Sequence, residues 1–156
     1  MKAVLVFLCA LAVPAGASAQ QVGLVGTWTL VSSPDPAGKK SATLGQNARG
    51  TLIFAPDGHY ALVMSRAGLP RFASNNRDRG TDDENRAVVA GSFAHSGRYT
   101  VDDARALFTW KVEASTFPNW ENSQQIRSFR ISGDELRYMS ATAQGGQPEA
   151  VWKRAK

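Results

Sequence analysis

Two polar residues two positions apart, Arg127 and Gln125, have the clearest chemical potential in this sequence. Residues two apart on a β-strand share one face, and the same alternation continues to Phe129 and Ile131, which a strand would bury. We therefore expect all four side chains to point into a barrel interior. An arginine there needs an acid, a wet opening or an anionic ligand group, because an unpaired buried charge is costly.

Three placements of Arg127 fit the sequence. Together with Gln125 it can anchor the polar end of a ligand, or it can hydrogen-bond residues 117–120, Phe-Pro-Asn-Trp. A β-bulge would instead turn the side chain outward, because a bulge shifts the alternation by one residue.

The 117–120 segment is either a lid over a cavity or a proline-fixed turn in which Phe117 and Trp120 cap the core.

The residues around the two histidines do not predict a metal site or a catalytic nucleophile. We expect His59 in solvent beside a turn, and His95 at a junction between a helix and a strand, where a protonated imidazole suits the negative helix end. Neither has a second histidine or a carboxylate at metal-ligand spacing.

No catalytic pattern is apparent either. Ser96 is next to His95, but adjacent residues on a strand face opposite ways, so the two do not form a nucleophile pair. The sequence has no nucleophile-elbow, phosphate-loop or dinucleotide motif. We predict no metal, no cofactor and no identifiable catalytic residue.

The elements that would position these residues are short strands separated by turns. Apolar and polar residues alternate within each run, and turn residues such as Pro56-Asp57-Gly58 separate the runs. Roughly eight antiparallel strands would close a small up-and-down barrel with no exposed edge, so the fold class is all-β. The predicted strands cover residues 24–33, 50–55, 59–66, 97–101, 106–115, 125–131, 135–142 and 147–154.

One short helix interrupts this pattern. Thr81-Asp82-Asp83-Glu84 is a capping box, in which Thr81 accepts from the third helical amide and Glu84 reaches back to the amide of the capping residue. The helix is predicted to run to about Phe93.

Alternation along the strands predicts an aromatic interior with few polar groups. Trp110 and Tyr138 can fill the core or contact a ligand. Further residues expected to face inward are Phe108, Val112, Leu136, Val101, Trp28, Leu30, Tyr60, Leu62 and Met64. The candidate ligand-binding set is Arg127, Gln125, Trp110, Tyr138, Tyr99, Phe129, Phe117 and Trp120.

Residues 1–19 have the pattern of a secretory signal peptide. Lys2 supplies the positive start, residues 3–13 are apolar, and Ala17-Ser18-Ala19 is a small-residue cleavage site. A mature domain at 20–156 in the periplasm or outside the cell is therefore expected. The apolar run is shorter than the ~20 residues of a spanning helix, so no stable membrane anchor is predicted.

Composition narrows the classes of partner. Cys9 lies inside the apolar run without the preceding small residue of a lipoprotein signal, so no lipid attachment and no disulfide are expected. The formal net charge is only +5, and the arginines are scattered rather than clustered around aromatic residues. That distribution argues against nucleic-acid binding. The oligomeric state stays open.

Several segments together resemble the bacterial lipocalin-like domain family of the calycin superfamily. In lipocalins a basic residue after the last strand packs over a tryptophan of the first strand, so the resemblance implies a structural motif of Gly26, Trp28 and Arg154 with a cation–π contact. Two positions depart from the family's pattern: His59 replaces an aromatic residue, and Trp110 stands where histidine is expected, which implies a smaller cavity. The segments that carry the resemblance are 24–31, 49–58, 72–74, 97–101, 117–120 and 151–154.

The function expected from this resemblance and from the inward-facing Arg127 is binding of a small, mostly apolar or amphipathic molecule in the barrel interior. Two alternatives remain open at this stage. The barrel could be a small-molecule isomerase or cyclase, in which cavity shape and one acid suffice, or a packed envelope protein without a ligand. A fold alone does not decide among them.

Overall fold

The computed structural model describes residues 23–33, 44–45, 47–140 and 149–156. The signal peptide expected at residues 1–19 lies outside this range, as do the ends of two predicted strands, 141–142 and 147–148. Within the described range, no helix has the length and apolar character needed to cross a bilayer.

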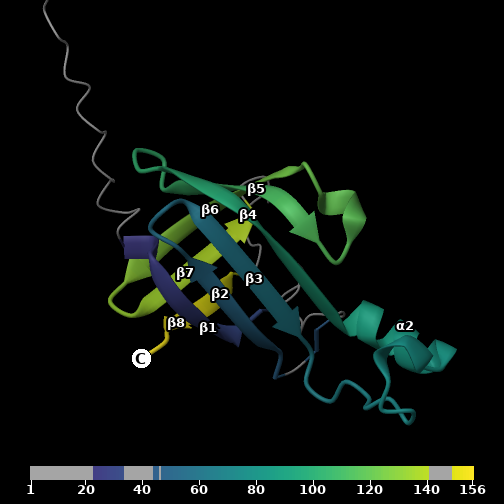
Figure 1. The fold of residues 1–156 in the computed structure, drawn as a ribbon. Coiled ribbons are helices and arrows are strands. Elements are labelled where there is room, and N and C mark those ends of the chain that lie inside the picture. The colour runs from purple at the N-terminus through teal and green to yellow at the C-terminus, as the bar shows by residue number, and fades with distance from the viewer. Residues whose placement is uncertain (1–22, 34–43, 46, 141–148) are drawn as a thin grey trace, which may run out of the picture.

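Eight antiparallel strands form a closed barrel in which each strand pairs with its neighbours in the sequence and β1 pairs with β8. This topology, visible in Figure 1, confirms the predicted up-and-down barrel. The strands are β1 (Gly26–Ser32), β2 (Arg49–Phe54), β3 (His59–Ser65), β4 (Ser92–Asp102), β5 (Leu107–Ser115), β6 (Gln124–Ser132), β7 (Glu135–Ser140) and β8 (Ala150–Arg154).

The two ends of the barrel differ in their connections. Short turns join β2 to β3, β4 to β5 and β6 to β7, and β1 begins at this same end; we call it the short-turn end. The opposite, long-loop end carries the 66–91 connection with helix α2 (Asp82–Gly91) and the 116–123 connection with the 3₁₀ turn η2 (Pro118–Trp120). Figure 1 shows α2 where β3 ends and β4 begins.

Helix α2 has the predicted capping box. The Thr81 amide donates to Glu84 Oε2 at 2.8 Å, and the Glu84 amide donates to Thr81 Oγ1 at 3.3 Å. Glu84 Oε1 also accepts from the Ala73 amide at 2.8 Å, which ties the preceding loop to the helix start. These bonds to backbone amides hold the pKa of the Glu84 carboxyl below its usual value.

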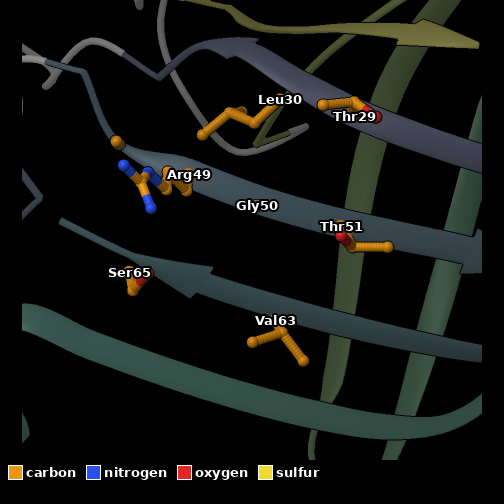
Figure 2. A pocket seen from close by; sticks show the side chains of 8 residues that line it. Thr29, Leu30, Arg49, Gly50, Thr51, Val63 and Ser65 are labelled. Atoms are coloured by element: carbon orange, nitrogen blue, oxygen red, sulfur yellow. The ribbon is translucent and has the colours of Figure 1, made fainter. Parts of the chain in front are cut away.

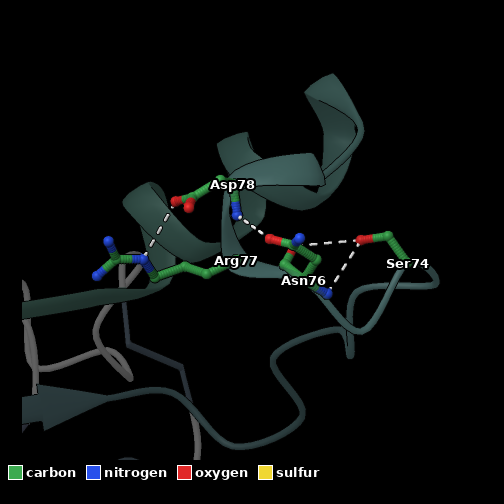
Figure 3. Close-up of polar contacts among 4 residues, drawn as sticks. All are labelled: Ser74, Asn76, Arg77 and Asp78. Atoms are coloured by element: carbon green, nitrogen blue, oxygen red, sulfur yellow. Dashed lines mark hydrogen bonds and ion pairs between the residues drawn. The ribbon is translucent and has the colours of Figure 1, made fainter.

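The loop before α2 is held by local polar contacts, drawn in Figure 3. Asn76 caps the 3₁₀ turn η1 (Arg77–Arg79), because its side chain accepts from the Asp78 amide at 2.9 Å. Ser74 Oγ donates to the Asn76 carbonyl at 3.1 Å and accepts from the Asn76 amide at 3.2 Å. This part of the loop is therefore held by bonds of its own.

The predicted boundary between helix and strand was wrong. Helix α2 ends at Gly91 rather than near Phe93, and β4 begins at Ser92, five residues before the predicted start. A Cβ at Gly91 would lie 2.7 Å from Arg66 Nε, so a larger residue would clash where the helix meets the end of β3. The extended start of β4 places His95 inside a strand, not at a helix terminus.

The barrel interior matches the alternation predicted from the sequence. Phe108, Trp110 and Val112 of β5 are buried, as are Leu136 and Tyr138 of β7. Val101 and Ile131, also expected inside, are half-buried residues packed against the core. The other predicted inward residues that the structure buries are Trp28, Leu30, Tyr60, Leu62, Met64, Tyr99 and Phe129.

The short-turn end is sealed by the motif that the resemblance implied. The Arg154 guanidinium carbon lies 4.2 Å from the Trp28 ring centroid, which confirms the cation–π contact. Arg154 also donates to the carbonyls of Val25 at 2.9 Å and Gly23 at 2.8 Å. Gly26 has φ +133°, and a Cβ there would lie 2.7 Å from Arg154 Nη1. Position 26 therefore requires glycine, because the Arg154 guanidinium lies directly against its backbone.

Candidate functional site

Arg127 faces the interior toward the long-loop end. It pairs in register with Phe108 of β5 and with Ser140, the last residue of β7. Its guanidinium carbon lies 5.3 Å from the Trp110 ring centroid. The alternative of an outward side chain at a bulge is therefore wrong.

The hydrogen bonds of Arg127 leave much of its donor capacity unused. Nη2 donates to Gln125 Oε1 at 2.7 Å, and Nη1 donates to the Ile126 carbonyl at 3.1 Å. In the part of the chain that the structure describes, it pairs with no carboxylate and does not bond residues 117–120, so the second alternative is absent there. Burial lowers the pKa of this guanidinium from its ordinary value, the expected sign for a desolvated cation.

A tyrosine and a histidine that the sequence analysis did not assign to the site lie against Trp110, the ring over which Arg127 is placed. Tyr60 Oη and His95 Nδ1 are 3.0 Å apart, and the His95 ring lies 5.2 Å from the Trp110 ring. His95 is only 5% exposed. Burial, and secondarily the charge of Arg127, lowers the pKa of His95 to about 4, so the imidazole is neutral at pH 7. Burial likewise raises the pKa of the Tyr60 hydroxyl.

The prediction of a protonated His95 at a helix end was therefore wrong. The alternation contained the signal that would have corrected it. Counting back in twos from Tyr99 reaches Gly97, His95 and Phe93, and β4 pairs these last two with the inward-facing Leu62 and Met64. His59, in contrast, is exposed as expected, and its Nδ1 lies 3.0 Å from Asp57 Oδ2.

Trp110 is the centre of the aromatic interior. Its ring contacts those of Tyr60 at 5.1 Å, Phe108 at 5.0 Å and Tyr138 at 5.4 Å, so rings occupy most of the middle of the barrel. Trp110 is 1% exposed, and its Nε1 has no hydrogen-bond acceptor among the described residues. A buried donor without an acceptor favours a site where a ligand oxygen or a water binds.

The structure divides the predicted site residues into three groups. Arg127, Gln125, Trp110 and Tyr138 come together, and with Tyr60 and His95 they form what we call the interior cluster. Tyr99 and Phe129 lie elsewhere in the core: the Tyr99 hydroxyl donates to the Ala55 carbonyl at 3.0 Å, and Phe129 packs on Phe108 at 5.5 Å.

The third group is the pair on the turn η2. Trp120 packs edge to face on His95 at 5.8 Å and on Phe93 at 5.5 Å. Phe117 packs on Trp120 at 5.4 Å and remains 47% exposed. Trp120 thus caps the interior cluster from the loop side, while Phe117 faces away from it.

A hollow of about 420 Å³ lies on the outer surface of β1, β2 and β3, around Gly50 (Figure 2). Exposed side chains of Thr29, Thr51 and Val63 line it. A Cβ at Gly50 would lie 3.2 Å from Trp152 Cη2, so the glycine lets the core tryptophan approach the backbone. No residue of the interior cluster lines this hollow.

Among the described residues, no group of three His, Cys, Asp or Glu side chains is arranged to hold a metal ion. The chemistry available in the interior cluster is instead that of hydrogen bonding and aromatic contact. Arg127 offers a cation, Gln125 an amide, and the Tyr60–His95 pair a neutral donor and acceptor. Such groups recognise an oxygen-bearing end of an otherwise apolar molecule.

Comparison with known proteins agrees with the barrel fold. The model of a lipocalin-like domain family matches residues 25–155. A curated relative, the 4'-hydroxy-3'-methoxypropiophenone carrier protein of Aspergillus oryzae, is 35% identical over 82 residues, which cover 49% of this chain and 73% of that protein. The match confirms the resemblance inferred from the sequence motifs.

Proposed function

Since this chain belongs to the lipocalin-like domain family, we propose that it binds a small, mostly apolar molecule in the barrel, with Arg127 and Gln125 orienting the polar end of the ligand. The family and a relative named as a carrier protein support ligand binding in general. The choice of ligand chemistry and of residues is our proposal.

The observation that carries this proposal is the incomplete bonding of Arg127. The cation is desolvated, yet among the described residues its partners are one amide oxygen and one carbonyl of its own strand. A carboxylate, phenolate or carbonyl oxygen of a ligand would supply the missing acceptor. Charge-assisted bonds of this kind contribute roughly 1.5–3 kcal/mol each.

The walls favour an aromatic ligand body. The rings of Tyr60, Tyr138 and His95 surround Trp110, over which the Arg127 guanidinium lies, and a planar molecule can pack on such edges and faces. The phenolic ketone in the name of the Aspergillus relative has this combination of a ring and oxygen atoms. We therefore propose an oxygenated aromatic molecule as the ligand class.

Titration of the protein with 4'-hydroxy-3'-methoxypropiophenone and with an aromatic carboxylic acid, followed by tryptophan fluorescence, tests the proposal. In the variant Arg127→Leu we expect affinity for the carboxylic acid to fall by roughly ten- to a hundredfold, the equivalent of one lost charge-assisted bond. Equal affinity in the parent and the variant would refute anchoring by Arg127.

The matched control is Arg130→Gln on the same strand. Arg130 is exposed and paired with Glu149 at 2.6 Å on the outer face, so its loss removes a similar charge without touching the interior. If this variant binds the carboxylic acid as the parent does, the loss of affinity in Arg127→Leu comes from the position of Arg127 inside the barrel and not from the change in the net charge of the protein.

The proposed place of action is the periplasm or the exterior of the cell, after removal of residues 1–19. The support is the sequence pattern of a charged start, an apolar run and a small-residue cleavage site. Mass measurement of the protein isolated from the periplasmic fraction should give a chain that starts at Gln20. A full-length chain retained in the cytoplasm would contradict export.

A further inference from the structure

A second hollow lies outside the barrel wall, between helix α2 and the turn η2 at the long-loop end. Its volume is about 380 Å³, which lies within the range of about 300–1,000 Å³ typical of small-molecule pockets. We call it the rim pocket. It is lined by Val88, Val89, Ser92, Phe93, Thr116, Phe117 and Trp120.

The lining of the rim pocket is mostly apolar: its polar side chains are the hydroxyls of Ser92 and Thr116, and it carries no ionisable side chain. Val89 of α2 is 79% exposed and Phe117 is 47% exposed, so two large apolar side chains face solvent beside the same hollow. Valine is also a weak helix former compared with alanine or leucine. Neither local helix preference nor core packing therefore explains Val89, whereas covering by an apolar ligand would.

Hydrogen bonds hold the helical wall of the pocket in place. Ser92 Oγ donates to the Val88 carbonyl at 2.7 Å and ends the helix beside the pocket. The Arg66 amide donates to the Gly91 carbonyl at 2.8 Å, which ties the end of α2 to the end of β3.

The opposite wall is held in the same way. The Ala94 amide donates to Thr116 Oγ1, and the Thr116 amide donates to the Ala94 carbonyl, both at 2.9 Å. Ser123 Oγ donates to the Trp120 carbonyl at 2.5 Å and closes the turn. Because both walls are bonded before any ligand arrives, binding would need little ordering of the protein.

The aromatic rings determine which molecule fits. Phe93 and Phe117 each meet Trp120 edge to face, at centroid distances of 5.5 Å and 5.4 Å, so the three rings present both faces and edges to the hollow. A flat ring packs well against such surfaces. Without a charged partner in the lining, an ionised ligand would gain nothing that offsets its desolvation.

We propose that the rim pocket is a binding site for an uncharged, flat aromatic molecule, separate from the interior cluster. The two sites share one wall: Trp120 lines the rim pocket on one side and packs on His95 of the interior cluster on the other. The rim pocket selects neutral rings, and the interior cluster selects molecules with a polar oxygen.

The experiment titrates the protein with N-phenyl-1-naphthylamine, an uncharged aromatic probe whose fluorescence rises in apolar surroundings. We expect Val89→Lys and Phe117→Ala each to weaken binding of this probe at least fivefold, because one places a charge in the pocket and the other removes a wall. The matched control Val31→Lys alters a valine that is 60% exposed on β1, outside the rim pocket, and should bind as the parent does.

Arg127→Leu separates the two sites in the same assay. If the rim pocket holds the probe, this variant binds it like the parent protein. If Arg127→Leu weakens probe binding while Val89→Lys and Phe117→Ala do not, the probe occupies the interior and the rim-pocket proposal is wrong. Parent-like binding in all variants also overturns it, and neither result bears on the anchoring of carboxylic acids by Arg127.

Sedimentation of the same variants tests the other occupant of an apolar hollow, a second copy of this chain. The proposal predicts that the parent and Val89→Lys sediment alike. A parent dimer that Val89→Lys dissociates would show that the rim pocket is an interface between copies and would overturn the small-molecule assignment.

Discussion

Two arginines of the barrel, Arg154 and Arg127, each lie over a tryptophan ring, but their hydrogen bonds differ. Those of Arg154 reach a distant segment of the chain, and those of Arg127 stay within its own strand. At the short-turn end, Arg154 lies 4.2 Å from Trp28, donates to two carbonyls and lies 3.7 Å from Asp134. Arg127 lies 5.3 Å from Trp110 and bonds one amide and one carbonyl next to it in its own strand.

The contrast separates a structural cation from one available to a ligand. The bonds of Arg154 link β8 to Gly23 and Val25, just before β1, so the guanidinium joins the two ends of the barrel. The bonds of Arg127 close only within β6 and add little to the tertiary structure. The short-turn end should therefore govern stability, and the interior cluster should govern binding.

Loss of the tryptophan under Arg154 should have the largest effect. Trp28 is fully buried and donates from Nε1 to the Leu24 carbonyl at 2.8 Å, so Trp28→Ala should lower the free energy of unfolding by about 3–5 kcal/mol. Urea unfolding measures this. Trp120→Ala in the turn η2 should cost clearly less, because Trp120 is only half-buried. An equal cost for the two variants would mean that stability is not concentrated at the short-turn end.

Acid should destabilise the protein through His95. The folded pKa of about 4 lies below the ordinary value of 6.5, so between these values the unfolded chain binds a proton that the folded chain does not. The free energy of unfolding is therefore unaffected by His95 above pH 6.5. It decreases as the pH drops toward 4, by about 3 kcal/mol in total. Urea unfolding from pH 7 to pH 4 would show this loss.

Two histidine variants check this assignment. His95→Gln should lack most of the loss of stability between pH 6.5 and 4, whereas His59→Gln should keep it, because His59 is exposed. If the loss persisted in His95→Gln, another group would be responsible for the acid sensitivity.

A methyl group at Gly26 should disturb the structural cation without touching the interior cluster. The added Cβ would lie 2.7 Å from Arg154 Nη1, and the φ of +133° disfavours any residue with a side chain. We expect Gly26→Ala to lower the free energy of unfolding by about 1–3 kcal/mol. Thermal unfolding measures the change, and ligand affinity should stay that of the parent. A parent-like melting temperature would contradict a tight Gly26–Arg154 contact.

The smallest effect on stability is expected at Arg127 itself. Replacing a buried, incompletely bonded cation with an apolar side chain is often neutral, so Arg127→Leu should change the free energy of unfolding by no more than about 1 kcal/mol in either direction. Arg154→Leu should cost more in the same urea experiment. If Arg127→Leu lowered the free energy of unfolding more than Arg154→Leu does, Arg154 would not be the structural arginine of the two.

Much of the fold followed from local sequence patterns. The capping box at Thr81 and the inward alternation of Phe108, Trp110 and Val112 depend on spacing within a few residues, and the structure has both. Arg127 was placed inside by the same reasoning, since Phe129 fixes the face of its strand.

What the sequence analysis missed depends on contacts between distant segments. His95 was misplaced because the strand was predicted to begin at residue 97. Alternation counted back from Tyr99 would have placed its side chain inside, but the start of β4 at Ser92 depends on the bond between the Arg66 amide, just after β3, and the Gly91 carbonyl. The pair of Tyr60 and His95 joins positions 35 residues apart, and the rim pocket depends on how α2 lies against the turn η2. No local pattern encodes these distances.

The most direct test of ligand binding by this barrel is native mass spectrometry of the mature protein, purified without added lipid, beside an organic extract of the same sample. We predict a co-purifying small molecule with an aromatic or apolar body and an oxygen-bearing end, absent from Arg127→Leu. A clean apo mass, together with no quenching of tryptophan fluorescence by fatty acids, aromatic acids or hydrophobic dyes, would contradict ligand binding and favour a packed barrel without a ligand.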